Sequence, residues 1–531
     1  MPTISKPRSF SCLLIVVPLG FSALPVEATQ PNPIEIGSKK QLFIDDFIVE
    51  SMTPRVYRLM NQPVKHRDNP VIRLDTEWEH KGGLSHGGDC GQVFFDPDLG
   101  LYRFYGLMVN WDWSQRWIFY AESRDGLHWV KPRLGQVKVL GYDTNFIALP
   151  FDAEASSNAI FRDPAASKQE ERYKMIYFQN RNGKRGMYPA YSADGLHWKA
   201  YDVNRPAVPY WSDTNNNLIW EAKSQRYLLY LRTFNSLNRW MKPESVYPDG
   251  ARTRTPGFAS STDFLVWDSP PSIRDAEDRF LCFHTDEKDP VGSRDFYTLE
   301  VMPYEGGYIG FTSVYHNMFG VAPAAMDAGK ARSPWMDRVD VQLLWSRDGE
   351  KFQRLGERRV FIPNGPEGSW DEDLIYAVHN GIVREDLGEI WIYYQGFSGH
   401  HWFEHRKEHQ RGQVGLAILR LDGFVCVTGQ GAVTTRPIKF KGARLTMNAS
   451  GVDKYSGPDY GTVRVEVLDA RSGQPVPGFG KEDSIPFGGD KIKHLVTWKG
   501  KADLKSLRDR SIQLRFHLNR AKLFSFQFVE D

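Results

Sequence analysis

The heptapeptide SRDGLHW, residues 123–129, returns almost unchanged as SADGLHW at residues 192–198. Weaker copies follow as STDFLVW from Ser261, SRDGEKF from Ser346 and RLDGFVC from Arg420. Successive copies start 69, 69, 85 and 74 residues apart. Because self-similarity at such periods is the mark of folds built from stacked units, this chain is predicted to have a repeat architecture.

The same order of segments precedes each copy: an apolar strand, a turn rich in Asp, Pro or Gly, an aromatic strand, and a third strand that runs into the repeated turn. The first unit reads GQVFFDPDLG, LYRFYGLM and RWIFYAESRDG, and the fifth reads NGIVREDLG, EIWIYYQG and VGLAILRLDG. Such runs are typical of antiparallel strands, and the Asp-Gly pair predicts a tight hairpin into a fourth strand, where the Trp packs. Four strands in each of five units predict an all-β fold, a five-bladed β-propeller.

The pattern changes after Cys426. Alternate residues are apolar in three segments, namely Val463, Val465 and Val467, then Ile512, Leu514, Phe516 and Leu518, then Phe524, Phe526 and Phe528. Strict alternation predicts half-buried strands, and we expect a C-terminal β-sandwich over residues 427–531. The segment QLFIDDFIVE at residues 41–50 predicts one more strand, which either closes the ring or packs on the sandwich.

The N-terminal segment has the pattern of a secretory signal peptide. Lys6 and Arg8 precede an apolar run over residues 10–23, and Val26-Glu27-Ala28 fits a cleavage site. A membrane anchor is the alternative, but the run is shorter than the roughly 20 apolar residues that span a bilayer. We therefore expect a signal peptide over 1–28, a secreted or periplasmic location, a catalytic propeller domain with its leading strand over 29–426, and the sandwich over 427–531.

Composition narrows the possible partners. The formal net charge is +2 with acids and bases interspersed, which argues against nucleic acid, and no later apolar run suggests a membrane partner. Cys90, Cys282 and Cys426 form an odd set without CxxC spacing, so no disulfide framework is expected. Aromatic residues make up 13 % of the chain, which suits stacking on sugar rings and equally suits packing between sheets. The sequence leaves the oligomeric state open.

A propeller with S-x-D-G-x-x-W hairpins and a following β-sandwich resembles the furanosidase superfamily of glycoside hydrolases, the invertase-like and arabinanase-like families 32 and 43. This resemblance implies a secreted glycoside hydrolase that acts on a polysaccharide or oligosaccharide without a cofactor. Of the invertase-like motifs, only Arg-Asp-Pro occurs, at residues 162–164, whereas the Asn-Asp-Pro-Asn-Gly and Glu-Cys motifs are absent. Aligning the units places Asp163 in the column of Asp96, in the turn that leaves the first strand, so we interpret Asp163 as a turn residue.

The catalytic candidates follow from the geometry of a propeller, in which the innermost strands converge on the axis and their ends share one pocket. Glycoside cleavage needs one carboxylic acid and one carboxylate. Just before three of the aligned first strands stand Asp89, Asp213 and Asp295, which we predict to be catalytic, although each could instead cap a turn. Glu300 aligns with Val93 inside the strand and is a weaker candidate.

Neighbouring side chains would hold the sugar. The predicted substrate-binding residues are His86, Asn158, Trp211, Asn216, His379 and Asn380.

One acidic pair near the N-terminus has two interpretations. The Asp45-Asp46 pair either reaches the pocket or forms a structural turn, and we favour the turn.

A histidine-rich segment, GHHWFEHRKEHQRG, spans residues 399–412. If the segment is helical, His401, His405 and His409 share one face and could bind a metal, but the interleaved Arg and Lys argue for an acidic or sulfated sugar instead. A solvated loop is the interpretation that we favour. We predict no metal site. A carbohydrate-binding propeller without catalysis is the alternative function, and a sialidase would need six blades and an arginine triad.

Overall fold

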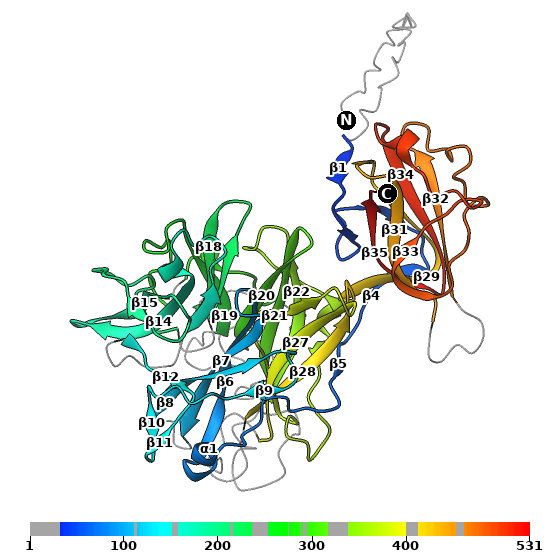
Figure 1. The fold of residues 1–531 in the computed structure, drawn as a ribbon. Helices are drawn as coiled ribbons and strands as arrows, with labels where there is room; N and C mark the ends of the chain where they lie inside the picture. The colour runs from blue at the N-terminus through cyan, green and yellow to red at the C-terminus, as the bar shows by residue number, and fades with distance from the viewer. Residues whose placement is uncertain are drawn as a thin grey trace, which may run out of the picture.

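The computed structural model shows two lobes, one formed by the middle of the chain and the other by its two ends (Figure 1). It describes residues 32–110, 114–150, 158–212, 216–235, 253–273, 276–286, 288–289, 295–316, 338–399, 412–452 and 461–530, with the backbone alone at residues 88–90, 235 and 253. The helical elements in these ranges are α1 (Glu77–Lys81) and the single turns η2 (Gln169–Glu171), η4 (Asp278–Phe280), η6 (Gly356–Arg358) and η7 (Lys505–Leu507). Within the same ranges, none of the helices has the length and apolarity needed to cross a membrane.

Three separate antiparallel sheets form the first three blades of the larger lobe. Blade one contains β6 (Leu84–Asp96), β7 (Leu101–Asn110), β8 (Arg116–Ser123), β9 (Trp129–Val130) and β12 (Phe146–Ile147). Blade two contains β13 (Ala159–Arg162), β14 (Tyr173–Arg181), β15 (Lys184–Ser192) and β16 (Lys199–Ala200). Blade three contains β17 (Asn217–Glu221), β18 (Arg226–Asn235) and β19 (Thr253–Ser261). A two-stranded ribbon of β10 (Lys138–Val139) and β11 (Tyr142–Asp143) lies between β9 and β12 in the chain.

The last two blades are joined by one parallel bridge, between Val339 and Leu374. Blade four contains β20 (Asp295–Tyr304), β21 (Gly307–His316), β22 (Arg338–Ser346), β23 (Gln353–Arg354) and β24 (Val360–Ile362). Blade five contains β25 (Leu374–Ala377), β26 (Ile382–Arg384), β27 (Glu389–Phe397), β28 (Gln413–Arg420) and, as its outer strand, β5 (Val64–Lys65) from the N-terminal segment.

The five blades form a closed ring. A hydrophobic core lies between each pair of consecutive blades from one to five. A further core joins blade five back to blade one and contains Val93 and Phe119 together with Trp391 and Leu416. The first strand of each blade is innermost, since β6 contacts both β13 and β25, β13 contacts β17, and β17 contacts β20. The predicted five-bladed propeller is therefore confirmed.

The repeated heptapeptide is the hairpin after the third strand of a blade, as predicted. In blade one the amides of Asp125 and Gly126 donate to Ser123 Oγ (3.3 and 2.9 Å), and the amides of Leu127 and His128 donate to Asp125 Oδ1 (both 2.8 Å). The same bonds recur in the copies that begin at Ser192, Ser261 and Ser346. Each of these bonds joins atoms within the heptapeptide itself, so the same residues form the same turn in each of these four blades.

The smaller lobe is a β-sandwich, also as predicted. Its strands are β1 (Ile34–Gly37), β2 (Gln41–Leu42), β3 (Val49–Met52), β4 (Val56–Met60), β29 (Val425–Thr435), β30 (Ile438–Phe440), β31 (Arg444–Ser450), β32 (Thr462–Asp469), β33 (Asp490–Leu495), β34 (Ile512–Asn519) and β35 (Lys522–Val529). The first part of β29 pairs with β4 and the second part with β34, so this strand passes from one sheet to the other. Gly429 lies at the crossing with φ 123°.

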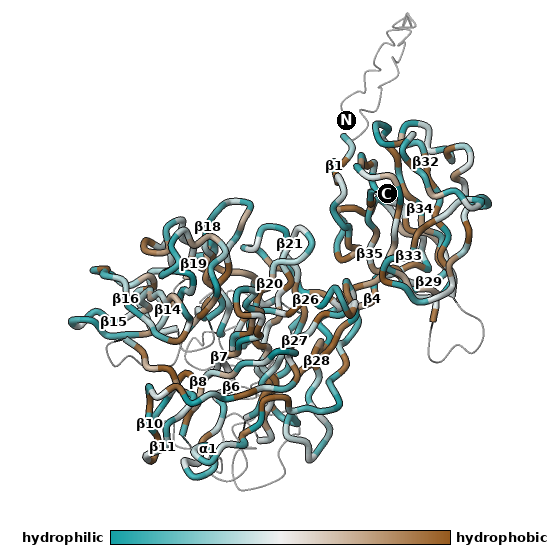
Figure 2. Tube along the Cα trace, viewed as in Figure 1, coloured by the Kyte–Doolittle hydropathy of each residue, from teal (hydrophilic) through white to brown (hydrophobic). Residues whose placement is uncertain are grey.

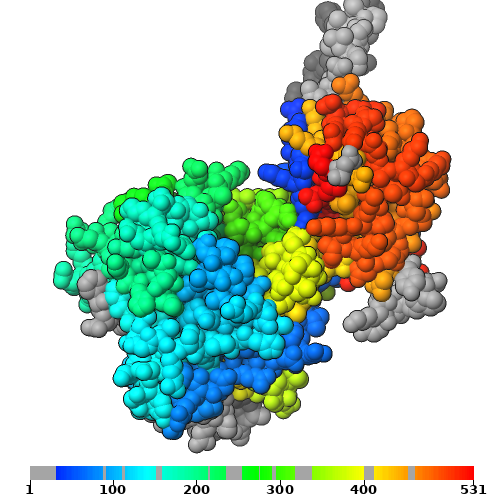
Figure 3. All heavy atoms as spheres, in the orientation of Figure 1, coloured from blue at the N-terminus to red at the C-terminus, as the bar shows by residue number. Residues whose placement is uncertain are grey.

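Both ends of the chain build this lobe. Figure 3 shows the blue N-terminal residues beside the red and orange C-terminal ones, with yellow residues of blade five against the same lobe. The segment 41–50 thus packs on the sandwich, and the ring-closing strand is β5 instead. The expected boundary after residue 426 falls inside β29. In Figure 2 hydrophobic segments run along the strands of both lobes, whereas the β14–β15 hairpin end is hydrophilic.

Candidate active site

Each blade contributes a buried polar side chain on its first strand, in the turn that interrupts that strand, or directly before it. These residues, called the axis cluster below, are Gln92, Asn158, Asn217, Glu300 and His379, and each is at most 2 % exposed. Gln92 Nε2 reaches the carbonyl of Asn158 in blade two (3.5 Å), and Asn217 Oδ1 accepts from the amide of Val301 in blade four (3.2 Å). These two bonds therefore link the first strands of neighbouring blades around the axis.

His379 joins blade five to blade one. Its amide donates to the carbonyl of Gly91 (2.9 Å), and its carbonyl accepts from the amide of Val93 (3.2 Å). Burial lowers the pKa of His379 to about 3, which the carbonyl of Leu218 opposes only weakly. Asn380 Nδ2 lies 3.0 Å from the ring Nε2. The imidazole is therefore neutral at pH 7 and acts as a hydrogen-bonding group.

Asp295 begins the first strand of blade four and is 4 % exposed. Its carboxylate accepts from the backbone amide of Arg254 (2.8 Å) and from the guanidinium of the same residue (3.3 Å). Arg254 also lies over the ring of Tyr297, 4.8 Å from its centroid. Blade three thus holds one predicted catalytic carboxylate in place through a single arginine.

Glu300 is the second carboxylate on β20, and it is fully buried. An irregularity in the pairing of β20 with β21 between Phe296 and Leu299 separates it from Asp295. The sequence alignment gave Glu300 less weight because it aligned with Val93 inside a strand. The structure shows that Glu300 is fully buried on an innermost strand, which the sequence does not reveal. This position makes Glu300 a second candidate for a catalytic carboxyl group.

Two predicted substrate-binding residues lie away from the axis cluster. His86 is fully buried, its ring stacks on Phe119 with the centroids 4.5 Å apart, and neither ring nitrogen has a hydrogen-bond partner among the described residues. Burial, aided by Lys131, lowers the pKa of His86 well below its usual value. Trp211 is half-buried and packs against Phe178 of blade two, with the ring centroids 5.9 Å apart.

Other predicted residues lie at or beside the axis. Asn158 belongs to the axis cluster, and Asn216, fully buried, precedes β17 with its amide 3.5 Å from the carbonyl of Ser212. Asn380 adopts a left-handed backbone conformation (φ 66°) in the turn between β25 and β26. The structure thus brings Asn158, His379 and Asn380 to the first strands, together with Gln92 and Asn217, which the sequence analysis missed.

Several predicted residues lie outside the described part of the chain. Asp213 and the histidine segment with His401, His405 and His409 are among them, and of Asp89 only the backbone is described, in β6. Their roles remain predictions. Among the described residues no group of three His, Cys, Asp or Glu side chains is arranged to hold a metal, and Cys282 and Cys426 are free and buried.

Asp163 of the Arg-Asp-Pro triplet has a structural environment. Its carboxylate accepts from the phenol of Tyr227 on blade three (2.8 Å) and pairs with Lys174 of its own blade (2.7 Å). Asp96 occupies the same place in blade one and accepts from the phenol of Tyr173 on blade two. Both acids end a first strand and fasten the next blade, in agreement with the interpretation of Asp163 as a turn residue.

The Asp45-Asp46 pair also lies away from the axis. Asp45 accepts from Trp345 Nε1 (2.8 Å) and from the guanidinium of Arg347 (2.8 Å), both near the hairpin that ends the third strand of blade four. Asp46 pairs with Arg58. The pair therefore ties the N-terminal segment to blade four, which fits the structural turn that we favoured.

Comparisons with known proteins show distant similarity. No family model matches the chain. An uncharacterized protein of Mycobacterium tuberculosis, Rv1502, is 28 % identical over 143 residues, which cover 25 % of this chain and 43 % of that protein, so the match spans less than half of its length.

Three solved structures are similar to the chain. The first is an N-acetylgalactosamine deacetylase from F. plautii in complex with blood group B trisaccharide, with 12 % identity, coverage of 70 % of this chain and 96 % of that one, and a TM-score of 0.41. The second is a Bombyx mori GH32 β-fructofuranosidase, with 10 % identity, coverage of 87 % and 94 % of the two chains, and a TM-score of 0.38. The third is a structure described with the GH130 family of mannoside phosphorylases and β-1,2-mannosidic linkages in Candida mannan, with 12 % identity, coverage of 70 % and 96 %, and a TM-score of 0.40. Because these TM-scores are below 0.5, the fold assignment rests on the strand pairing and the ring of cores described above.

Proposed function

We propose that this protein is a secreted glycoside hydrolase that cleaves a glycosidic bond in a polysaccharide or oligosaccharide at the propeller axis. The observation that carries the proposal is the pair of buried carboxylates on one innermost strand, Asp295 and Glu300, in a ring whose other first strands carry buried amides and a neutral imidazole. Hydrolysis of a glycoside needs two carboxyl groups beside the scissile bond, and polar neutral groups suit sugar hydroxyls.

The surroundings of the two carboxyl groups suggest a division of roles. Asp295 is held by an ion pair with Arg254 and suits the role of nucleophile or general base. Glu300 is fully buried beside the axis and suits proton donation to the leaving oxygen. Asp89 and Asp213 remain predicted members of the same site, and residues 1–28 remain the predicted export signal.

The test is release of reducing ends by the purified protein from a panel of polysaccharides and aryl glycosides. On any substrate that is cleaved, Asp295→Asn and Glu300→Gln are expected to lower kcat/KM by about 10²-fold to 10⁴-fold, the range for loss of an acid–base group. Glu367→Gln, on the exposed connection between blades four and five, is the matched control and should leave the rate unchanged.

Two outcomes contradict the proposal. Binding without release across the whole panel would favour a carbohydrate-binding propeller. Full activity in both Asp295→Asn and Glu300→Gln, with folding confirmed by circular dichroism, would place the chemistry elsewhere.

A further inference from the structure

The segments that begin and end the propeller meet twice, once in the sandwich and once in blade five. The chain reaches blade one after β4 and β5, and it leaves blade five through β28 and β29. β4 pairs antiparallel with β29, from Val56 opposite Gly429 to Met60 opposite Val425. β5 pairs with β28, with Lys65 opposite Ala417. The segments that begin and end the ring are therefore hydrogen-bonded to each other twice.

The fifth copy of the repeated hairpin lies at this junction and has a different environment from the others. In blade four, Asp348 Oδ1 accepts from the amides of Glu350 and Lys351 in its own hairpin, and the ends of such hairpins face solvent. Asp422, the corresponding residue in the fifth copy, is 2 % exposed. Arg420 replaces the serine that the other four copies have at the first position.

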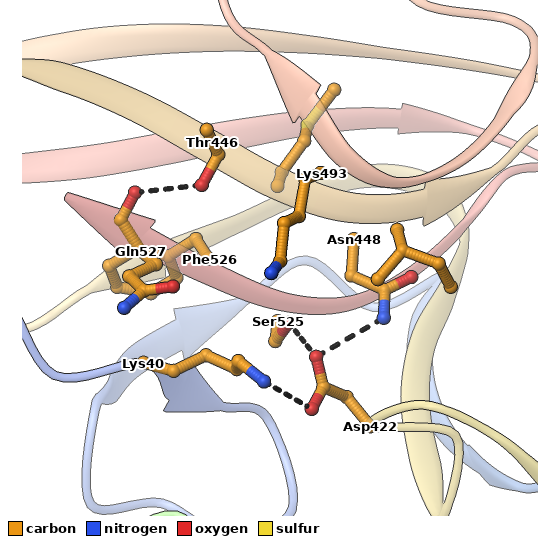
Figure 4. A pocket seen from close by; sticks show the side chains of 10 residues that line it. Lys40, Asp422, Thr446, Asn448, Lys493, Ser525, Phe526 and Gln527 are labelled. Carbon is orange, nitrogen blue, oxygen red and sulfur yellow. Dashed lines mark hydrogen bonds and ion pairs between the residues drawn. The ribbon is translucent and has the colours of Figure 1, made fainter. Parts of the chain in front are cut away.

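The Asp422 carboxylate accepts from four side chains. Lys40 Nζ lies 3.0 Å from Oδ1, while Ser525 Oγ and Asn448 Nδ2 lie 2.6 and 3.2 Å from Oδ2, as the close-up shows (Figure 4). The phenol of Tyr304 donates to the same carboxylate. The donors come from four segments: the residues before β2, the end of β20 in blade four, β31 and β35. A single buried charge thus joins the N-terminal segment, the propeller and the C-terminal strands.

Neighbouring contacts reinforce this junction. Lys40 is 9 % exposed and also pairs with Glu305 (2.9 Å), which follows β20. Arg420 Nε donates to Asn448 Oδ1 (2.8 Å), which fixes the amide that faces Asp422. Both oxygens of the Asp422 carboxylate therefore accept hydrogen bonds. A buried charged network whose polar atoms are all paired favours a single arrangement of its side chains.

We propose that the sandwich is a clasp that fastens the closed propeller ring, and that Asp422 locks it. Asp422→Asn leaves Lys40 buried with one carboxylate fewer and replaces one of the two acceptor oxygens with an NH₂ group, which cannot accept from the donors of either domain. We expect this substitution to weaken the strand pairs that hold the two ends of the ring together, which are β4 with β29 and β5 with β28. The clasp is independent of catalysis.

The test is hydrogen–deuterium exchange by mass spectrometry on the full chain, with Asp422→Asn compared with Asp348→Asn. Asp422→Asn is expected to speed exchange at least about tenfold in β4, β5 and β28, on both sides of the ring closure, and to leave β14 of blade two unchanged. Asp348→Asn removes the same carboxylate from the same motif and is expected to speed exchange only within residues 346–352.

Other outcomes decide against the clasp. Faster exchange confined to β31, β34 and β35 would show that Asp422 stabilises the sandwich alone. Equal effects of the two variants on β5 and β28 would show that the hairpin, not the junction, matters. If Asp422→Asn does not fold, Ser525→Ala removes one donor only, and it must raise exchange in β5 and β28 for the proposal to stand.

Discussion

The phenol of Tyr393, on β27 of blade five, donates a hydrogen bond to the carbonyl of Gly126 in the hairpin of blade one (2.6 Å). The phenol of Tyr230, on β18 of blade three, makes the same bond to the carbonyl of Gly349 in blade four (2.7 Å). The contact between the last and first blades is thus of the same kind as a contact between consecutive blades. Ring closure uses the repeat unit itself, with the sandwich as an additional fastening.

Tyr393→Phe should destabilise the protein by about 0.5–1.5 kcal/mol, because one hydrogen bond between blades is lost while the Gly126 carbonyl keeps Trp129 Nε1 as a donor (3.0 Å). The measurement is the midpoint of thermal or urea unfolding. Tyr57→Phe is the control, since Tyr57 is 55 % exposed, and it should leave the midpoint unchanged. Equal midpoints for Tyr393→Phe and wild type would show that this bond does not contribute to closure.

Gly126→Ala should be more damaging than Gly135→Ala. Both glycines have positive φ, 76° and 68°, so both substitutions incur roughly 1–2 kcal/mol of left-handed strain. A Cβ at Gly126 would also lie 2.8 Å from the ring of Trp391 and from the phenol oxygen of Tyr393, whereas Gly135 has open space around it. The difference between the two unfolding midpoints measures the contact between blades five and one, and equal values would contradict it.

Asp163→Asn should lower stability without abolishing turnover. Removing one charge of a buried pair typically costs about 3–5 kcal/mol, and Lys174 would be left with its ammonium in the core between blades two and three. Urea unfolding checks the stability, and kcat on a cleaved substrate checks the chemistry. A stable Asp163→Asn variant with its turnover abolished would instead assign this residue to catalysis.

Acid should destabilise the protein through its buried imidazoles. The pKa of His379 is about 3 when folded against an ordinary 6.5, so between pH 6.5 and 3 the unfolded chain binds the proton more tightly. Stability is therefore greatest above pH 6.5 and falls by up to about 1.4 kcal/mol per pH unit as the pH drops through that window. Unfolding midpoints of His379→Gln, measured between pH 7 and 4, should fall less steeply than those of the wild type.

An unchanged slope in His379→Gln would contradict the assignment of this pH dependence to the axis. Asp295→Asn is a useful comparison, because it changes a neighbouring strand without removing an imidazole. Its slope should retain the contribution of His379.

Local chemistry could be predicted from the sequence with good success. The repeated hairpin depends on Ser123, Asp125 and Gly126 acting on their own backbone, so seven letters suffice to specify it and five copies suffice to count blades. The alternation after Cys426 predicted the sandwich for the same reason, since period two reports which face of a strand is buried. Even the role of Asp163 followed from comparing one unit with the next.

The composition of the axis cluster could not be predicted in this way. In β6 the pairing with β7 moves from His86 opposite Met108 to Gly91 opposite Gly106, so three extra residues bulge out just where the strand meets the axis. A second irregularity occurs in β20 between Phe296 and Leu299. Because each slip of one residue turns a side chain to the other face, column alignment misplaces the residues beyond it.

The sequence alone determined the blade hairpins, the number of repeat units and the sandwich strands, because each depends on hydrogen bonds or periodicity within a few residues. Tertiary structure alone decided which polar groups share the axis and which partners surround Asp422, since Lys40, Asn448 and Ser525 come to it from three separate segments of the chain. Contacts between residues hundreds of positions apart depend on bulges and closure, and no local pattern encodes those.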